Sequence, residues 1–359
     1  MAASEISVRS HLQAGQVIPA HPLALTARRT LDERHQRALT RYYVDAGAGG
    51  IAVGVHTTQF AIRHPHHGLY RPVLELAAET ARAALRDAPG TPTAARRPFA
   101  LIAGVIGDTR QAVKEAESAA ALGYHVALLG LGALASASEA ELIRHCRAVA
   151  EVMPLFGFYL QPAVGGRVLS YTFWREFAEI PSAWAIKIAP FNRYQTLDVV
   201  RAVADAGRDD LALYTGNDDN IIPDLLTPFP VQVGGRPTTR RIIGGLLGQW
   251  AVWTRVAVRL LERVRAERDG PLDPRWLRDG AALTDANAAI FDAAHGFAGC
   301  IPGIHEVLRR QGLMAGSWCL DPTETLSPGQ SEEIDRVMRH FPELADDDFI
   351  REHLDRWLA

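Results

Sequence analysis

Short apolar runs alternate with longer amphipathic runs along most of the chain. The apolar runs lack the polar alternation of a half-exposed strand, which is typical of parallel strands buried on both faces. Eight such runs predict strands at residues 22–25, 50–55, 99–105, 125–131, 155–160, 184–188, 211–214 and 230–233. Amphipathic segments between them predict helices at residues 31–45, 109–122, 139–152 and 196–206, with Asp108 and Ser138 as N-caps of the second and third.

Eight strand–helix units predict an α/β fold, a (β/α)8 TIM barrel with a helical C-terminal extension. No GxGxxG follows the first strand, which argues against an open, doubly wound sheet. After the eighth strand the pattern predicts one long helix at 240–268 and further helices at 285–295, 303–311, 331–341 and 347–358. We therefore expect a barrel at 1–268 and an extension at 269–359 packed on it, with an elbow at 270–274 and a surface loop at 88–97.

Composition narrows the classes of function. The net charge of −3 and pI near 6.5 give no basic surface for nucleic acid or for an anionic membrane. No apolar run reaches the ~18 residues that span a bilayer, and the N-terminal residues lack the pattern of a signal peptide. Three cysteines without CxxC spacing favour neither disulfides nor zinc. These features predict a cytoplasmic protein without a metal site.

Lysine usage is the most informative compositional feature. Of 38 basic residues only Lys114 and Lys187 are lysines, so arginine serves wherever a plain positive charge is enough. Lys187 lies in the apolar stretch Ile186-Lys187-Ile188 of the sixth predicted strand. Burial disfavours the ammonium form and leaves a nucleophilic amine, which arginine cannot provide. The structural alternative is a strand-end lysine paired to a carboxylate.

Other candidates follow strand ends, where the active sites of such barrels lie. Tyr159 ends the fifth strand, where its phenol can relay a proton; the alternative is a core tyrosine. Thr57 and Thr58 follow the second strand, where two hydroxyls can hold a carboxylate; the alternative is ordinary turn chemistry.

Together these residues resemble the dihydrodipicolinate synthase/N-acetylneuraminate lyase family of class I aldolases and lyases. The resemblance rests on the pair Thr57-Thr58, on Tyr-x-x-Pro at 159–162 and on Ile186-Lys187, in that order on successive barrel units. It runs from the first predicted strand, with His-Pro-Leu-Ala-Leu-Thr at 21–26, to the C-terminal helices. The resemblance implies a homo-oligomer that needs no metal or organic cofactor.

The resemblance also implies roles for single residues. Lys187 would form the imine with pyruvate or another 2-oxo acid, Tyr159 would relay protons, and Thr57 and Thr58 would bind the substrate carboxylate. The segment Gly216-Asn217-Asp218-Asp219 resembles the one with which sugar-acid lyases bind substrate hydroxyls. Helix N-capping by Asn217 or Asp218 is the alternative for that segment.

Three departures from the family pattern bear on substrate. The stretch 129–134 lacks a tyrosine that the synthases carry after the fourth strand, residues 163–166 lack an arginine and Arg167 comes later, and Gln59-Phe60 replaces Gly-Glu. We therefore expect a lyase, aldolase or related dehydratase acting on a 2-oxo acid with an aldehyde or sugar-acid partner, and not dihydrodipicolinate synthesis. The alternative is a non-catalytic barrel that binds a 2-oxo acid. The cluster Arg63-His64-Pro65-His66-His67 predicts a solvated loop, with His64 or His56 as minor candidates for substrate contact.

Overall fold

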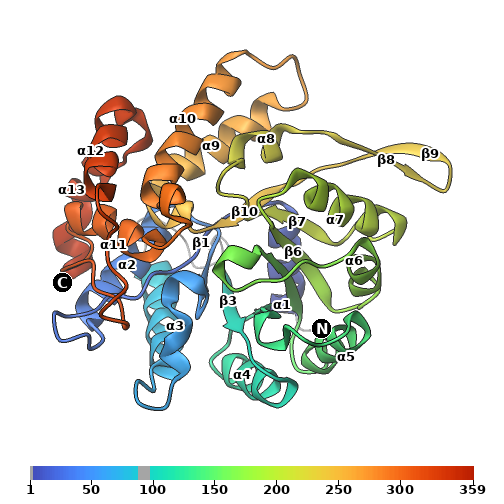
Figure 1. The fold of residues 1–359 in the computed structure, drawn as a ribbon, viewed down its shortest axis with the longest axis horizontal. Helices are drawn as coiled ribbons and strands as arrows, with labels where there is room; N and C mark the ends of the chain where they lie inside the picture. The colour runs from blue at the N-terminus through green and yellow to red at the C-terminus, as the bar shows by residue number, and fades with distance from the viewer. Residues whose placement is uncertain (1–2, 88–97) are drawn as a thin grey trace. The chain divides into compact units, whose positions relative to one another are not determined.

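The computed structural model describes residues 3–87 and 98–359 and contains a (β/α)8 barrel (Figure 1). Its eight-stranded sheet has the order β1-β10-β7-β6-β5-β4-β3-β2. The strands are β1 (Val17–Pro19), β2 (Gly50–Val53), β3 (Ala100–Val105), β4 (Val126–Leu129), β5 (Leu155–Leu160), β6 (Ala183–Ala189), β7 (Ala212–Thr215) and β10 (Gly244–Leu247). The predicted fold class is confirmed.

Two of the predicted strands were placed wrongly. The first barrel strand is β1, five residues before the predicted start at residue 22. The run predicted as the eighth strand is β8 (Phe229–Val233), which pairs antiparallel with β9 (Arg236–Arg240) in a separate hairpin that extends beyond α7 in Figure 1. The burial of β8 alternates along its length, as expected of a strand with one solvent face.

The long helix predicted at 240–268 is also wrong. This stretch contains β10, the 3-10 turn η6 (Gln249–Ala251) and α9 (Thr254–Glu267). Glycines at 244, 245 and 248 disfavour a helix there. Gly244 is also required sterically, because a Cβ on it would lie 2.5 Å from the backbone nitrogen of Gln16.

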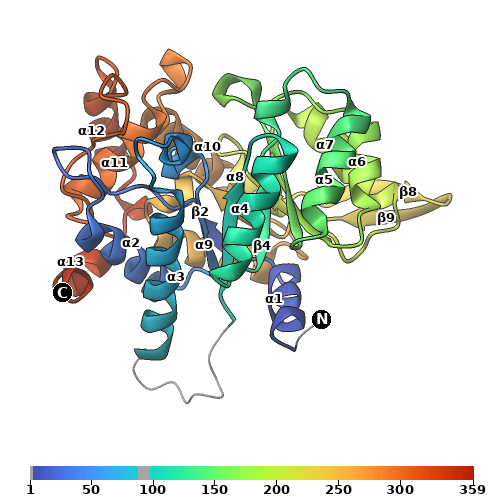
Figure 2. The same ribbon diagram turned by 90° about the horizontal axis from the view of Figure 1, so that it is seen from below.

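The chain divides into two compact units, and the first comprises Met1–Gln16 and Ala100–Leu246. Its parallel ladder runs from β3 through β4, β5, β6 and β7 to β10. Figure 2 shows α4 (Thr109–Ala121), α5 (Glu139–Ala150), α6 (Tyr171–Ala178) and α7 (Arg193–Asp205) beside one another outside the strands. The unit also contains α1 (Ala3–Gln13), which contacts β3 and β6, and α8 (Ile221–Leu226), with 3-10 turns η4 (Gly132–Leu134) and η5 (Pro162–Val164).

The helix starts in this unit follow the predicted capping chemistry. The Asp108 side chain accepts a hydrogen bond from the backbone N–H of Gln111 at 2.8 Å. Ser138 and Glu141 form a reciprocal capping box at the start of α5. Both predicted N-caps are confirmed.

The second unit comprises Val17–Phe99 and Leu247–Ala359. Its C-terminal helices pack against α2, with the Trp357 and Tyr42 rings 5.4 Å apart. The Tyr42 hydroxyl donates to buried Asp346 at 2.7 Å and accepts from the Thr254 N–H at 2.7 Å. Besides α9, the helices are α2 (Glu33–Ala46), α3 (Tyr70–Asp87), α10 (Arg275–Ile290), α11 (Cys300–Arg310), α12 (Gln330–His340) and α13 (Asp347–Leu358), with 3-10 turns η1 (His56–Thr58), η2 (Phe60–Arg63), η7 (Ala293–His295) and η8 (Pro342–Leu344).

The C-terminal region is helical, as the sequence predicts. The boundary expected at residue 268 stays a prediction, and the loop expected at 88–97 lies outside the described residues. Within 3–87 and 98–359, no helix is both long and apolar enough to cross a bilayer.

Candidate active site

Lys187 lies in the middle of β6 and is 8% exposed. It is in register with Phe158 on β5 and with Tyr214 on β7. Residues in register on neighbouring parallel strands point to the same face of the sheet, and the next residue points to the other face. Lys187, Phe158 and Tyr214 therefore share one face.

The opposite face of β5 carries the helix layer. A Cβ on Gly157 would lie 2.8 Å from Phe177 and 3.1 Å from Trp174, both on α6. Gly157 and Phe158 alternate along the strand, so Phe158 and Lys187 point away from α6. In a (β/α)8 barrel that is the inner face, which is where a strand-borne catalytic lysine has to point.

Phe158 is the aromatic neighbour of the amine. The Lys187 Nζ atom lies 4.6 Å from the centroid of the Phe158 ring. A cation over an aromatic face is stabilised, so this contact favours the ammonium form, whereas burial favours the neutral amine. Phe158 was not among the predicted site residues, because motif spacing along the chain does not show strand register.

Tyr159 points to the helix layer. It is in register with Ile188, one position beyond Lys187, and its ring lies 5.3 Å from that of Trp174 on α6. Its hydroxyl donates to the Leu169 carbonyl at 3.0 Å and accepts from the Leu169 N–H at 3.2 Å, and burial raises its pKa. The structure does not bring Tyr159 together with Lys187, and the arrangement matches the alternative of a core tyrosine with a satisfied hydroxyl.

Gly216, just beyond β7, makes room for the lysine side chain. A Cβ on it would lie 2.6 Å from Cε and 2.9 Å from Cγ of Lys187, and 2.7 Å from Cβ of Ala189. The Gly216 N–H donates to the Ile188 carbonyl at 2.7 Å, which holds this backbone beside β6. Only glycine lets the lysine stem cross here without displacement.

Asn217 has a structural role. Its Oδ1 accepts from the Phe191 N–H at 3.0 Å, and its Nδ2 donates to Asp224 at 2.9 Å and to Thr196 at 3.3 Å. Asp224 is buried and also accepts from Thr215, Asn220 and Arg193. These bonds join the loops after β6 and β7. They occupy the Asn217 side chain, which argues against its predicted contact with substrate.

Asp218 and Asp219 follow at the same strand end. Asp218 is buried, and burial raises the pKa of Asp219, with Arg193 opposing that effect. Neither caps α8, because the helix begins at Ile221 after Asn220. The capping alternative for Asp218 is therefore wrong, and two carboxyl groups remain as candidate acceptors for substrate hydroxyls.

Arg167 directly follows residues 163–166, the segment in which the family resemblance led us to expect an arginine. Its Nη1 donates to the carbonyls of Leu134 at 2.7 Å and Ala137 at 3.0 Å. The side chain therefore ties the loop after β4 to the loop after β5, and that structural role accounts for its position in the sequence.

In the second unit, Thr57 and Thr58 end the η1 turn after β2. The Thr58 hydroxyl donates to the His21 carbonyl at 2.7 Å and accepts from the N–H groups of Gly54 and Val55 at 3.0 and 3.3 Å. Its single proton is thus used within the protein. The Thr57 hydroxyl lies 3.4 Å from the same carbonyl, at the limit of a hydrogen bond, so it can turn to another acceptor.

The residue whose carbonyl accepts from Thr58, His21, is itself held by hydrogen bonds of its ring. Its ring nitrogens lie 2.8 Å from the Thr40 hydroxyl and 2.8 Å from the Pro22 carbonyl, and Gln36 donates to the same carbonyl at 2.9 Å. Burial lowers the pKa of His21 to about 4, so the ring is neutral at pH 7. His21 was not predicted as a site residue, because no motif marks a histidine that supports a turn through its backbone carbonyl.

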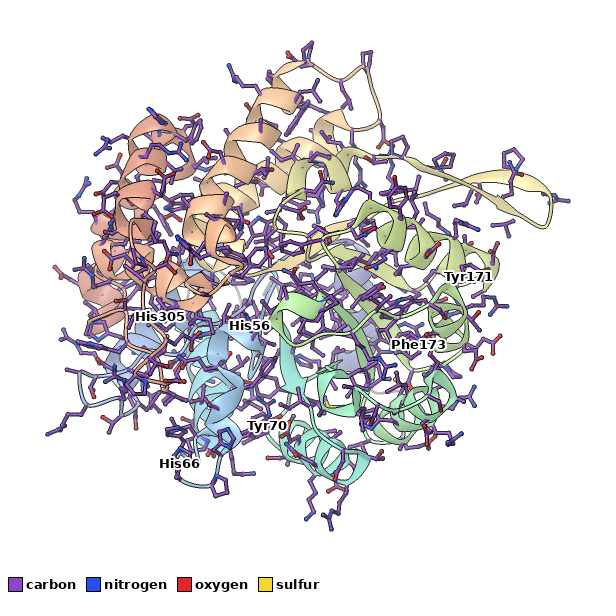
Figure 3. All side chains as sticks on the ribbon, in the orientation of Figure 1. His56, His66, Tyr70, Tyr171, Phe173 and His305 are labelled. Carbon is purple, nitrogen blue, oxygen red and sulfur yellow. The ribbon has the colours of Figure 1, made fainter. Side chains whose placement is uncertain are left out.

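The histidine loop carries three neighbouring rings. His64 stacks on His66 with centroids 5.6 Å apart, and His66 and His67 lie 3.9 Å apart. In the described parts of the chain, no group of three or more His, Cys, Asp or Glu side chains is arranged to hold a metal ion. Figure 3 labels His66 on this loop and His56, which opens the η1 turn and lies 6.0 Å from the Phe60 ring.

Comparisons with known proteins show which solved structures share this fold. No protein-family model and no curated protein matches the sequence. Among solved structures, N-acetylneuraminate lyase from Fusobacterium nucleatum has a TM-score of 0.69 at 17% identity, covering 92% of this chain and 99% of that one. Dihydrodipicolinate synthase from Oceanobacillus iheyensis has a TM-score of 0.70 at 16% identity, covering 93% and 99%.

A third structure is a prophage protein of the dihydrodipicolinic acid synthase family from E. coli K12 in complex with pyruvate. Its TM-score is 0.68 at 17% identity, covering 92% of this chain and 98% of that one. The three structures agree over almost their whole length with the barrel described above. This chain has the fold of the N-acetylneuraminate lyases and dihydrodipicolinate synthases.

Proposed function

We propose that this protein is a lyase or aldolase that forms an imine between Lys187 and a 2-oxo acid such as pyruvate. The observation that supports this proposal most directly is the burial of Lys187 on the inner face of the barrel, where Gly216 leaves space for the lysine stem. The fold, shared with lyases and with a pyruvate-bound protein, supports the same chemistry.

In the cleavage direction, the Lys187 amine would attack the C2 carbonyl carbon of a 4-hydroxy-2-oxo acid to give a carbinolamine, which loses water to form a protonated imine. The imine withdraws electrons from C3, so cleavage of the C3–C4 bond leaves an enamine and releases an aldehyde. The substrate C4 hydroxyl gives up its proton as the aldehyde forms. Protonation of the enamine at C3 and hydrolysis then release the 2-oxo acid and restore the amine. The imine is the electron sink, so the proposed reaction needs no metal or organic cofactor.

Substrate binding is assigned to two strand ends. The Thr57 hydroxyl can donate to the substrate carboxylate, whereas Thr58 supports the turn through its bonds to His21 and Gly54. Asp218 and Asp219 can accept from the hydroxyls of a sugar-acid tail. Asn217 and Tyr159 are assigned to structure, because their polar atoms bond to Asp224 and Leu169.

Adduct trapping tests the proposal. The protein is incubated with pyruvate and borohydride, digested, and the modified peptide is located by mass spectrometry. A reduced pyruvyl group on Lys187 is expected, and Lys187→Arg should abolish it. Lys114→Arg is the matched control, because Lys114 is the other lysine of the chain and lies exposed on α4. An unmodified Lys187 with pyruvate and with longer 2-oxo acids would refute the proposal.

A non-catalytic 2-oxo-acid-binding barrel is the second candidate. Phe158 favours it, since the aromatic side chain beside the amine carries no hydroxyl with which to relay a proton. This candidate predicts thermal stabilisation by pyruvate without turnover of any aldol or sugar-acid substrate. Cleavage of a single sugar acid would exclude it.

We also propose that the protein forms a homo-oligomer and works in the cytoplasm. All three cysteines are buried and outside disulfides, so the described fold does not depend on an oxidising compartment. Light scattering of the eluted protein during size-exclusion chromatography would give the mass of the assembly, and a mass of 39.2 kDa would contradict the oligomer.

A further inference from the structure

A cleft of about 360 Å³ lies on the outside of the barrel, at the start of β7. Its walls come from β7, α7, α1 and the segment that joins β9 to β10, all within the first unit. Leu213 in this wall is in register with Ile186, whereas the next residue, Tyr214, is in register with Lys187. Successive residues of a strand point to opposite faces, so Leu213 points away from the face that carries Lys187. The cleft is therefore separate from the candidate active site.

The crossover from β7 to β10 explains why a cleft forms here. In a (β/α)8 barrel a helix covers the outside after each strand. In this crossover the helix is α8, which has only six residues, whereas α7 has 13. The remainder of the crossover is the β8–β9 hairpin, which contacts α7 through β8 and extends beyond it in Figure 1. The hairpin brings Thr239 and Arg240 to the cleft, so polar and cationic groups border a space that no long helix covers.

The side chain of Arg208, next to the cleft, shows a completed arginine–carboxylate pair. Its Nε donates to one oxygen of Asp210 at 2.8 Å and its Nη2 donates to the other at 3.0 Å. These two nitrogens lie on one edge of the guanidinium, and parallel bonds from that edge to two oxygens make a strong pair. The bonds from Arg208 lower the pKa of Asp210, which Arg9 also contacts. Asp210 is therefore ionised and already matched by two cations.

The same edge of Arg240 is only half used. Its Nη2 pairs with Asp209, whereas within residues 3–87 and 98–359 no acceptor bonds to its buried Nε. The Asp209 side chain is 84% exposed, and an exposed pair of this kind is weak, so Asp209 can yield to a ligand. A buried donor of a charged group without an acceptor is costly. Arg241, which also lines the cleft, donates to the Leu226 carbonyl at 3.2 Å.

We infer that this cleft binds a small molecule that carries a phosphate or carboxylate group. Two oxygens of that group accept from Nε and Nη2 of Arg240, which completes the pairing that Arg208 already makes with Asp210. At and beside the cleft, four arginines face two aspartates, so the charge favours an anion. The apolar side chains of Val203, Leu211 and Leu213 suit an apolar body attached to the anionic group. This second ligand site does not depend on imine formation at Lys187.

Calorimetric titration of the full chain with phenyl phosphate and with phenylacetate tests the inference. Each probe joins an anionic group to an apolar ring, and we expect at least one of them to bind once per chain. Arg240→Lys keeps the positive charge but loses the two-pronged edge, so it should weaken binding about tenfold or more. Arg236→Lys is the matched control, because Arg236 is exposed on the same strand and does not line the cleft. That variant and Lys187→Arg should both bind as the wild type does.

The outcomes separate this site from the candidate active site. Thermal unfolding without ligand shows whether Arg240→Lys folds as the wild type does. If it does not, Thr239→Trp replaces it, because a bulky side chain at this exposed position should block the cleft and abolish binding. No saturable binding of either probe to the wild type, or equal binding by Arg240→Lys, overturns the inference. Binding that Lys187→Arg removes and Arg240→Lys retains places the probe near Lys187, which also overturns it.

Discussion

Replacing Gly216 by alanine tests whether the lysine stem needs the space beside β7. The added Cβ would lie 2.6 Å from Cε and 2.9 Å from Cγ of Lys187, far inside ordinary van der Waals contact. Its third close neighbour, Cβ of Ala189 at 2.7 Å, belongs to the strand itself. The lysine stem is the more flexible partner, so we expect it to move and to carry Nζ away from its present position.

The expected loss of trapping rate follows from the distance that the lysine side chain must move. Relieving contacts this short requires a shift of about 1 Å, and a misplacement of that size costs about 100-fold in rate for a positioned catalytic group. Overpacking of this kind destabilises a fold by about 1–3 kcal/mol. We therefore expect the rate of pyruvate trapping on Lys187 to fall about 100-fold in a protein that still folds.

Borohydride trapping at a fixed pyruvate concentration gives the rate, and thermal unfolding gives the stability. Gly270→Ala is the matched control, because the nearest atom to its Cβ would be the Glu267 carbonyl oxygen at 3.8 Å, and it should leave both measurements unchanged. Trapping by Gly216→Ala at the wild-type rate would refute the steric argument and weaken the case for Lys187 as the nucleophile.

Three further predictions follow from single contacts. Tyr159→Phe should trap pyruvate at close to the wild-type rate but lose about 1–3 kcal/mol of stability in a denaturant titration, because both its bonds to Leu169 are internal; a large loss of trapping would restore the proton-relay role. Thr57→Val should raise the half-saturating pyruvate concentration without loss of stability, whereas Thr58→Val should lower the unfolding midpoint because its hydroxyl makes three bonds in the turn; the reverse pattern would exchange their roles. The pKa of His21 is about 4 in the folded protein against 6.5 when exposed, so its contribution to stability is complete above pH 6.5 and is lost, up to about 3 kcal/mol, as pH falls towards 4; denaturant midpoints should show less of this loss in His21→Gln.

The helical layer could be predicted from the sequence because its signals are local. Caps such as Asp108 and Ser138 and the apolar spacing of the amphipathic runs act within a few residues. The first and eighth strands were missed because β1 is three residues long and β10 is Gly-Gly-Leu-Leu, too short and too glycine-rich for a periodic pattern. The sequence of β8 alternates between apolar and polar residues, whereas that of β10 does not. The hairpin strand β8 was therefore predicted as the eighth barrel strand in place of β10.

The sequence predicts candidate site residues but not the face of the sheet on which each one lies. Motif spacing identified Lys187 and the turn after β2, yet spacing cannot show how two strands are registered against each other. A shift of one residue exchanges the two faces of a strand, and this decides between Phe158 and Tyr159. Gln59 was noticed only as a departure from a family pattern. Its hydrogen bond with Leu320 joins residues 261 apart in sequence, which no local pattern indicates.

Register also constrains the chemistry that the barrel can perform. On the face shared with Lys187, Phe158 has no titratable group, and the Tyr214 hydroxyl donates to the Leu12 carbonyl at 2.6 Å. Neither is suited to take the proton that a retro-aldol cleavage releases. Asp219, which follows β7 in the same unit, is a carboxyl whose pKa is raised by burial, and a carboxyl can accept such a proton. A carboxyl in this role would pair proton transfer with recognition of substrate hydroxyls at the end of β7. Under the proposed function, this would favour a substrate whose aldehyde half carries hydroxyl groups.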